Sequence, residues 1–185
     1  GRLLDLLRTC LRQVLSDIPP DAFLQAAIQP VLRVLPEDQS LSIAVYLDQT
    51  RPDPPLLPRD PGDSAHVRSL ALAIACDIHP LNNLRVLNYL KAELGQDEAA
   101  RNGWYRHWIA TGFAALEQQL VASAGRYCFG DTLTLADVCL LPQVFNAQRF
   151  AVDMGGYPLL ARIAANLEQV PAFADAHPSR QPDAQ

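Results

Sequence analysis

The sequence predicts an α+β protein in which a Pro-rich connector joins a short mixed segment to a long all-helical region. The connector is residues 51–62, where five prolines between Arg51 and Pro61 prevent a continuous helix and favour an extended chain. After it, in residues 63–185, apolar residues recur at three- and four-residue spacing, as they do in packed helices. Before it, residues 1–50 combine helical patterns with a short strand candidate.

The helical region begins with a helix that Asp63 or Ser64 can cap. Its apolar pattern runs toward Pro80 and resumes at Leu81. We therefore expect one long helix that bends near Pro80 and stops at Gly95.

Three further features organise the rest of this region. A second helix is expected over about 98–122, and the apolar residues that recur along one face of it are Trp104, Trp108, Phe113, Leu116 and Leu120. Thr134 and Asp137 have the spacing of a capping box, with Asp in place of Glu. The residues after this box are apolar almost all round, which predicts a buried central helix. A last helix is expected over about 159–170, ending before Pro171.

Residues 1–50 predict a helix, one or two strands and a second helix. An apolar helical stripe stops at Ile18-Pro19-Pro20, residues 30–35 are a strand candidate, and residues 40–47 have a helical pattern. Because a stable sheet needs about three strands, this segment is too short to form an independent sheet domain.

Composition excludes several classes of function. The 185 residues are 49% apolar and 19% charged, with a net charge of -5 and no basic run, so neither nucleic acid nor an anionic membrane is an expected partner. No apolar stretch is long enough for a membrane span and no signal peptide is recognisable, so we expect a cytoplasmic protein. The cysteines lie far apart and lack zinc-ligand spacing, which predicts reduced thiols and no metal site; they are Cys10, Cys76, Cys128 and Cys139.

Motifs from Gln39 to Asp183 match one known family in order and without a large gap. The pattern Gly-Asp-x-x-Thr-x-Ala-Asp at residues 130–137 indicates the glutathione-transferase superfamily. The patterns Ile-His-Pro-Leu-Asn-Asn at residues 78–83 and Asn-Ala-x-Arg-Phe at residues 146–150 select one class within it. The chain thus resembles the zeta-class glutathione transferases, which are the maleylacetoacetate and maleylpyruvate isomerases.

This resemblance implies a fold, a reaction and an assembly. Residues 1–50 would be a shortened or degenerate thioredoxin-like part that binds glutathione, and residues 63–185 the all-helical C-terminal domain of that fold. Glutathione would be the cofactor of a reaction that needs no metal. Its thiolate adds to the cis double bond of a maleyl keto acid, the bond rotates, and loss of the thiolate leaves the fumaryl isomer, as in aromatic compound catabolism. Family members pair through both domains, which implies a homodimer.

Four residues match positions that the resemblance assigns to glutathione binding. Gln39 and Ser40 match the pair that holds the glutamyl end, where the free amides of a helix N-terminus favour a carboxylate. His79 and Asn83 lie at the expected bend and are the other two candidates. Structural roles remain open for each, since Ser40 can be an ordinary helix cap and an Asn near a bend can satisfy free backbone carbonyls.

Two arginines are candidates for binding the carboxylates of the substrate. Arg85 and Arg149 offer guanidinium groups, which remain charged and form bidentate bonds with carboxylates. Arg149 follows an apolar helix, an unfavourable place for a charge unless it faces a cavity. The alternative for Arg149 is an ion pair with Asp137 or Asp153.

One element of the family pattern has no match in these residues. Family members begin with a strand and a Ser-Ser-x-x-x-Arg-x-Arg segment whose Ser hydroxyl stabilises the thiolate. This sequence contains no Ser-Ser pair, and Arg8-Thr9-Cys10-Leu11-Arg12 is only a weak echo of the segment. Two hypotheses remain open: a glutathione-dependent cis-trans isomerase, and a catalytically impaired relic of the fold that acts as a binding module.

Overall fold

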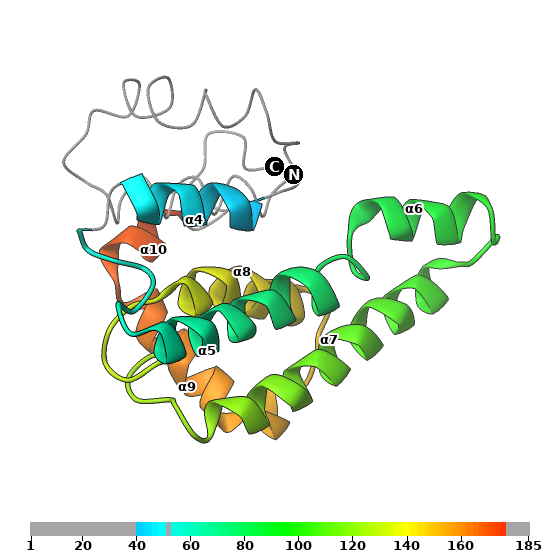
Figure 1. Ribbon diagram of the computed structural model, residues 1–185. Coiled ribbons are helices and arrows are strands. Elements are labelled where there is room, and N and C mark those ends of the chain that lie inside the picture. The colour runs from blue at the N-terminus through cyan, green and yellow to red at the C-terminus, as the bar shows by residue number, and fades with distance from the viewer. Residues whose placement is uncertain (1–39, 51–52, 177–185) are drawn as a thin grey trace.

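A computed structural model describes residues 40–50 and 53–176, and this part of the chain is a helical bundle without a β-strand (Figure 1). The predicted strand at residues 30–35 lies outside the described residues. The elements in chain order are α4 (Ser40–Thr50), α5 (Pro61–Leu72), a π-helical segment (Ala73–Ile78), α6 (Leu84–Ala92), α7 (Glu98–Leu120), α8 (Leu135–Arg149), a short 3-10 turn (Met154–Gly156), α9 (Pro158–Glu168) and α10 (Pro171–Ala176). None of these helices is long and apolar enough to cross a membrane.

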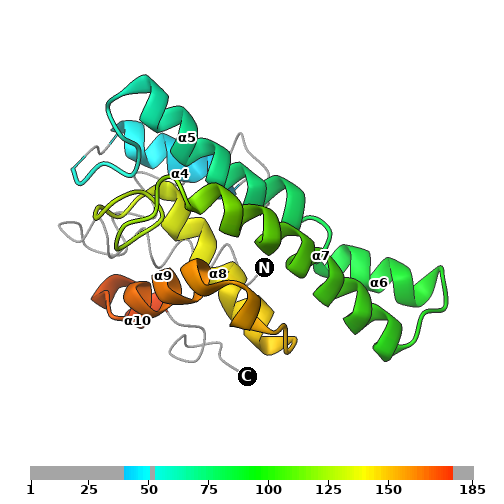
Figure 2. The same ribbon diagram turned by 90° about the horizontal axis from the view of Figure 1, so that it is seen from below.

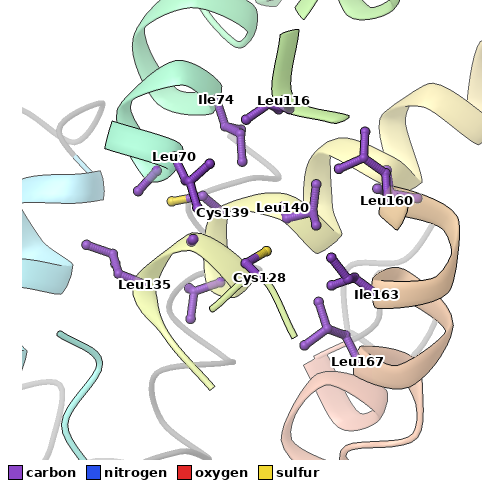
Figure 3. Close-up of a cluster of buried hydrophobic side chains, with 14 of the residues drawn as sticks. Leu70, Ile74, Leu116, Cys128, Leu135, Cys139, Leu140, Leu160, Ile163 and Leu167 are labelled. Carbon is purple, nitrogen blue, oxygen red and sulfur yellow. The ribbon is translucent and has the colours of Figure 1, made fainter. Parts of the chain in front are cut away.

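Helix α8 is the centre of the bundle, as its apolar sequence predicts. It packs against α5, α9 and the π-helical segment, and it crosses the middle of the molecule in the second view (Figure 2). Figure 3 shows Cys139 and Leu140 of α8 between Leu70 of α5 and Ile163 of α9. The core therefore forms around one helix that is covered on several sides.

The capping box at the start of α8 is confirmed. One carboxylate oxygen of Asp137 accepts hydrogen bonds from the backbone N–H and the hydroxyl of Thr134, both at 2.8 Å. The other oxygen accepts from the backbone N–H of Cys128, also at 2.8 Å. Asp137 is fully buried, so it joins the preceding loop to the helix inside the core.

Helix α5 begins earlier than its predicted caps, which were wrong. Asp60, rather than Asp63 or Ser64, is the N-cap, and its carboxylate accepts from the N–H groups of Gly62 at 2.8 Å and Asp63 at 3.0 Å. Pro61 then occupies the first turn, where its missing N–H costs nothing and its restricted φ suits a helix.

The single long helix predicted to bend near Pro80 is interrupted instead. The π-helical segment ends at Ile78, a turn follows, and α6 starts at Leu84. Pro80 cannot donate the hydrogen bond that would continue the helix, and Asn83 caps a new one. Gly95, with a φ of 61°, follows the end of α6 in the connection to α7.

The predicted apolar face of α7 is confirmed at Phe113, Leu116 and Leu120 and is wrong at the two tryptophans. Trp104 and Trp108 are only partly buried, and the buried side chains of this helix are Tyr105, Ile109, Phe113, Leu116 and Leu120. The two tryptophans pack edge to face with ring centroids 5.6 Å apart. Their position is set by neighbouring segments, which the pattern of a single helix does not show.

The last predicted helix is confirmed as α9, and a short further helix, α10, follows it. Helix α9 ends at Glu168, and Pro171 starts α10 as a first-turn proline instead of only ending its predecessor. Both oxygens of Glu117 in α7 accept from the start of α9, at 2.7 Å from Leu159 N and 3.0 Å from Leu160 N. This carboxylate supplies the cap that α9 lacks in its own sequence.

Candidate functional site

The turn between the π-helical segment and α6 carries a cluster of polar side chains. We call residues 78–83 the bend. The His79 N–H donates to Ile74 O at 2.9 Å, which is a π-helical hydrogen bond, and Leu81 N donates to Ile78 O at 3.2 Å. Short π-helical turns are frequent at functional sites because they widen a helix and redirect a side chain. His79 and Asn83 both lie on the bend, and Arg85 follows in the first turn of α6.

His79 has an environment that keeps its imidazole neutral. Burial, and after it the positive charge of Arg85, lower the pKa of His79. Its Nδ1 is buried and has no hydrogen-bond partner among the described residues. A neutral imidazole with a free ring nitrogen can bond to a polar group of a ligand.

The two asparagines of the bend have different roles. Asn83 is the N-cap of α6, and its side-chain oxygen accepts from Arg85 N at 3.0 Å. That bond is a structural role for Asn83, although it satisfies an N–H rather than a carbonyl. Asn82 is only 4% exposed, and within residues 40–50 and 53–176 neither of its amide atoms has a hydrogen-bond partner. Asn82 is therefore the asparagine with free hydrogen-bonding capacity, which the Asn-Asn motif alone cannot reveal.

Arg149 ends α8 beside a pair of stacked aromatic rings. The rings of Tyr105 and Phe150 are nearly parallel with centroids 3.6 Å apart, and the guanidinium carbon of Arg149 is 5.7 Å from the Phe150 centroid. Burial raises the pKa of Tyr105 to about 12, an effect that the charge of Arg149 partly opposes. The rings thus hold an exposed cation at the junction of α7 and α8.

Neither predicted ion-pair partner is used by Arg149 within the described residues. Asp137 is engaged in the capping box, and Asp153 accepts from Gly155 N at 2.8 Å. Both oxygens of Asp137 are engaged, and the described residues contain no ion pair between Arg149 and Asp153, so that alternative is wrong.

The structure brings some of the predicted site residues together. His79, Asn83 and Arg85 share the bend and the start of α6, whereas Arg149 lies on α8 and makes no hydrogen bond to the bend among the described residues. Ser40 begins α4, but its side chain is outside the described part. Gln39 lies outside the described residues altogether.

Comparisons with known proteins agree with the motifs. Residues 98–172 match the family model of the glutathione S-transferase C-terminal domain. A probable maleylacetoacetate isomerase of Vibrio cholerae is 55% identical over 147 residues, which are 80% of this chain and 68% of that protein. The chain spans about two thirds of the length of the curated relatives it matches.

Solved structures extend the likeness to the fold. A maleyl pyruvate isomerase described as a bacterial zeta-class glutathione S-transferase has a TM-score of 0.85 and 37% identity, covering 100% of this chain and 96% of that chain. Maleylacetoacetate isomerase from Anaeromyxobacter dehalogenans, solved with glutathione in its active site, has a TM-score of 0.82 and 32% identity, covering 100% and 94%. The chain therefore has the glutathione-transferase fold and belongs to that family, within the zeta-class group of maleylacetoacetate and maleylpyruvate isomerases.

Proposed function

We propose that this chain is a glutathione-dependent isomerase that converts a maleyl keto acid, either maleylacetoacetate or maleylpyruvate, into its fumaryl isomer. The observation that carries the proposal is the bend, where a neutral imidazole, a free buried amide and a guanidinium lie within a few residues of each other. Relatives with the same fold have been solved with glutathione bound in the active site.

The polar groups of the bend suit glutathione as a ligand. Glutathione carries two carboxylates and two peptide groups, which need hydrogen-bond donors and a compensating positive charge. In the part of the chain that the structure describes, His79 Nδ1 and the Asn82 amide have no hydrogen-bond partner, and Arg85 is exposed. We assign glutathione binding to His79 and Asn83 of the bend together with Gln39 and Ser40, and to residues 1–50 as a whole. Asn83 uses only its side-chain oxygen in the cap of α6, so its amide N–H groups can donate to glutathione.

Arg149 and Arg85 are the residues that we assign to the maleyl substrate. When bound, glutathione supplies a thiolate that can add to the double bond and leave again. An arginine can hold a substrate carboxylate in both the ground state and the transition state. A guanidinium can also stabilise the negative charge that develops on the conjugated keto group. Arg149 is exposed beside Phe150, and no carboxylate of the described residues neutralises it.

The test is isomerisation of maleylpyruvate by the purified chain, followed by proton NMR of the vinylic signals. Reactions without glutathione, and with S-methylglutathione in its place, are the controls, because the proposed reaction needs a free thiol. We expect turnover only with glutathione, and we expect it to be slow, because no recognisable hydroxyl in the sequence stabilises the thiolate. A rate on the order of 10 per second, which is ordinary for an enzyme, would show that another group activates the thiol.

A binding module is the second candidate, because the sequence has no Ser-Ser pair to stabilise a thiolate. A thiol with an unshifted pKa of about 8.5 is only a few per cent ionised at neutral pH. Glutathione binding in calorimetry without any turnover would favour this candidate over the isomerase.

We also propose a cytoplasmic homodimer. Helix α6 exposes Leu84 at 68% and Tyr89 at 57%, large apolar side chains of the kind that subunit contacts cover. Cys76, Cys128 and Cys139 are free thiols, which fits a reducing compartment. Sedimentation showing only monomer at micromolar concentration would contradict the dimer, and recovery outside the cytoplasmic fraction would contradict the location.

A further inference from the structure

Helix α7 contacts the bend closely at Gly112. A Cβ atom added at this position would overlap Cγ1 and Cδ1 of Ile78, the last residue of the π-helical segment. Ile78 is 1% exposed, so its side chain has little free space into which to move. Glycine is therefore required at residue 112 for α7 to lie this near to Ile78.

A second contact between α7 and the bend lies two turns away, at Trp104. The indole Nε1 of Trp104 donates a hydrogen bond to the backbone O of Leu81 at 2.7 Å. This carbonyl belongs to a turn after a broken helix, where no helical N–H is available to it. Figure 1 shows α7 running beside the end of α5 and the start of α6, the stretch that contains both contacts.

The two contacts enclose the functional part of the bend. Ile78 directly precedes His79, and Leu81 follows Pro80. The backbone N–H of His79 also donates to Ile74 O at 2.9 Å. The π-helical segment therefore fixes the backbone at His79 as well. Because α7 contacts the backbone segments on both sides of His79, the orientation of the His79 side chain depends on the position of α7.

We propose that Gly112 and Trp104 of α7 are positioning residues that set the orientation of His79 through their contacts with Ile78 and Leu81. This inference rests on the proposed function in one respect, the assignment of His79 to glutathione binding. Neither residue is proposed to touch glutathione or substrate. A role limited to packing would change the stability of the fold and leave the properties of His79 unaltered.

The decisive variant is Trp104→Phe, which removes the N–H donor and keeps an aromatic ring. Trp108→Phe is the matched control, because the Trp108 indole is one turn away and its buried Nε1 donates to no acceptor of the described residues. The first readout is the His79 pKa, measured by NMR titration of the imidazole protons and assigned with His79→Gln. This titration needs no glutathione, so its result tests the positioning role independently of the proposed function.

We expect Trp104→Phe to raise the His79 pKa toward 6.5, the ordinary value, as the freed bend exposes the imidazole. Trp108→Phe should leave it unchanged. Calorimetry should show glutathione affinity falling about tenfold in Trp104→Phe alone, equivalent to about 1.4 kcal/mol. If the wild-type chain binds no glutathione, the proposed function fails while the titration still decides the positioning role.

A rescue experiment tests the contact of Gly112. Gly112→Ala should shift the His79 pKa in the same direction as Trp104→Phe. The double variant Gly112→Ala with Ile78→Ala should restore it, because the new Cβ would lie 3.6 Å from the Cβ of residue 78, an ordinary contact. An unchanged His79 pKa in folded Trp104→Phe and folded Gly112→Ala would overturn the proposal, and if Gly112→Ala does not fold, Trp104→Phe alone decides.

Discussion

At the scale of single residues, one local arrangement occurs at two arginines of the described helical region. Arg149 lies over the ring of Phe150, and Arg126 lies over the ring of Tyr127 with its guanidinium carbon 5.4 Å from the centroid. Both side chains are exposed. Only Arg149 lies in the motif that selects the zeta class. We therefore assign substrate binding to Arg149 and not to Arg126, although the two arginines have similar local environments.

Replacing Arg149 with Ala should raise KM for the maleyl substrate and lower kcat. Loss of a charge-assisted contact typically costs about 1.5–3 kcal/mol, which corresponds to about a 10- to 100-fold lower kcat/KM. Arg126→Ala is the matched control and should keep wild-type kinetics. Unchanged steady-state kinetics in folded Arg149→Ala would remove this residue from the site.

At the scale of elements, α8 depends on a carboxylate inside the core. Asp137 accepts two backbone N–H groups and one hydroxyl while fully buried. Without it, these donors would remain buried and unpaired, which costs more than the loss of an ordinary exposed cap. The capping box therefore links the packing of α8 to the loop before it.

Replacing Asp137 with Ala should lower the free energy of unfolding by about 3 kcal/mol. Asp131→Ala is the comparison, because Asp131 also accepts a loop N–H, from Arg126 at 2.8 Å, but is exposed. We expect it to cost about 1 kcal/mol or less. Equal midpoints of urea unfolding for the two variants would show that burial of the carboxylate has no special effect.

At the scale of the whole molecule, His79 makes stability depend on pH. Its pKa is lowered in the folded chain, chiefly by burial, so on acidification the unfolded chain takes up a proton that folded His79 resists. Stability is thus retained above the ordinary pKa of about 6.5 and is lost as pH falls below it. We expect His79→Gln to lose less stability than wild type between about pH 7.5 and 5.5.

Urea unfolding at several pH values checks this expectation. The quantity compared between wild type and His79→Gln is the slope of the free energy of unfolding against pH. His107→Gln, which replaces an exposed histidine of α7, is the control and should keep the wild-type slope. A steeper loss for His79→Gln on acidification would contradict the predicted sign.

Much of the bundle was predictable because it depends on neighbours in the sequence. The capping box of Thr134 and Asp137, the burial of α8 and the helical character of residues 98–120 follow from short-range hydrogen bonds and from the spacing of apolar residues. The motifs around His79 and Arg149 likewise identified the family, since each lies within a few consecutive residues.

Tertiary structure decided the features that join distant residues. Which face of α7 is buried depends on α9 and the π-helical segment, so Tyr105 lies inside while Trp104 turns its N–H to Leu81. The ring stack beside Arg149 joins Tyr105 to Phe150, which lie far apart in the chain. The spacing of apolar residues predicts that a helix has an apolar side. The segments packed against that helix determine which of its residues are buried in the core and which remain available to bind a ligand.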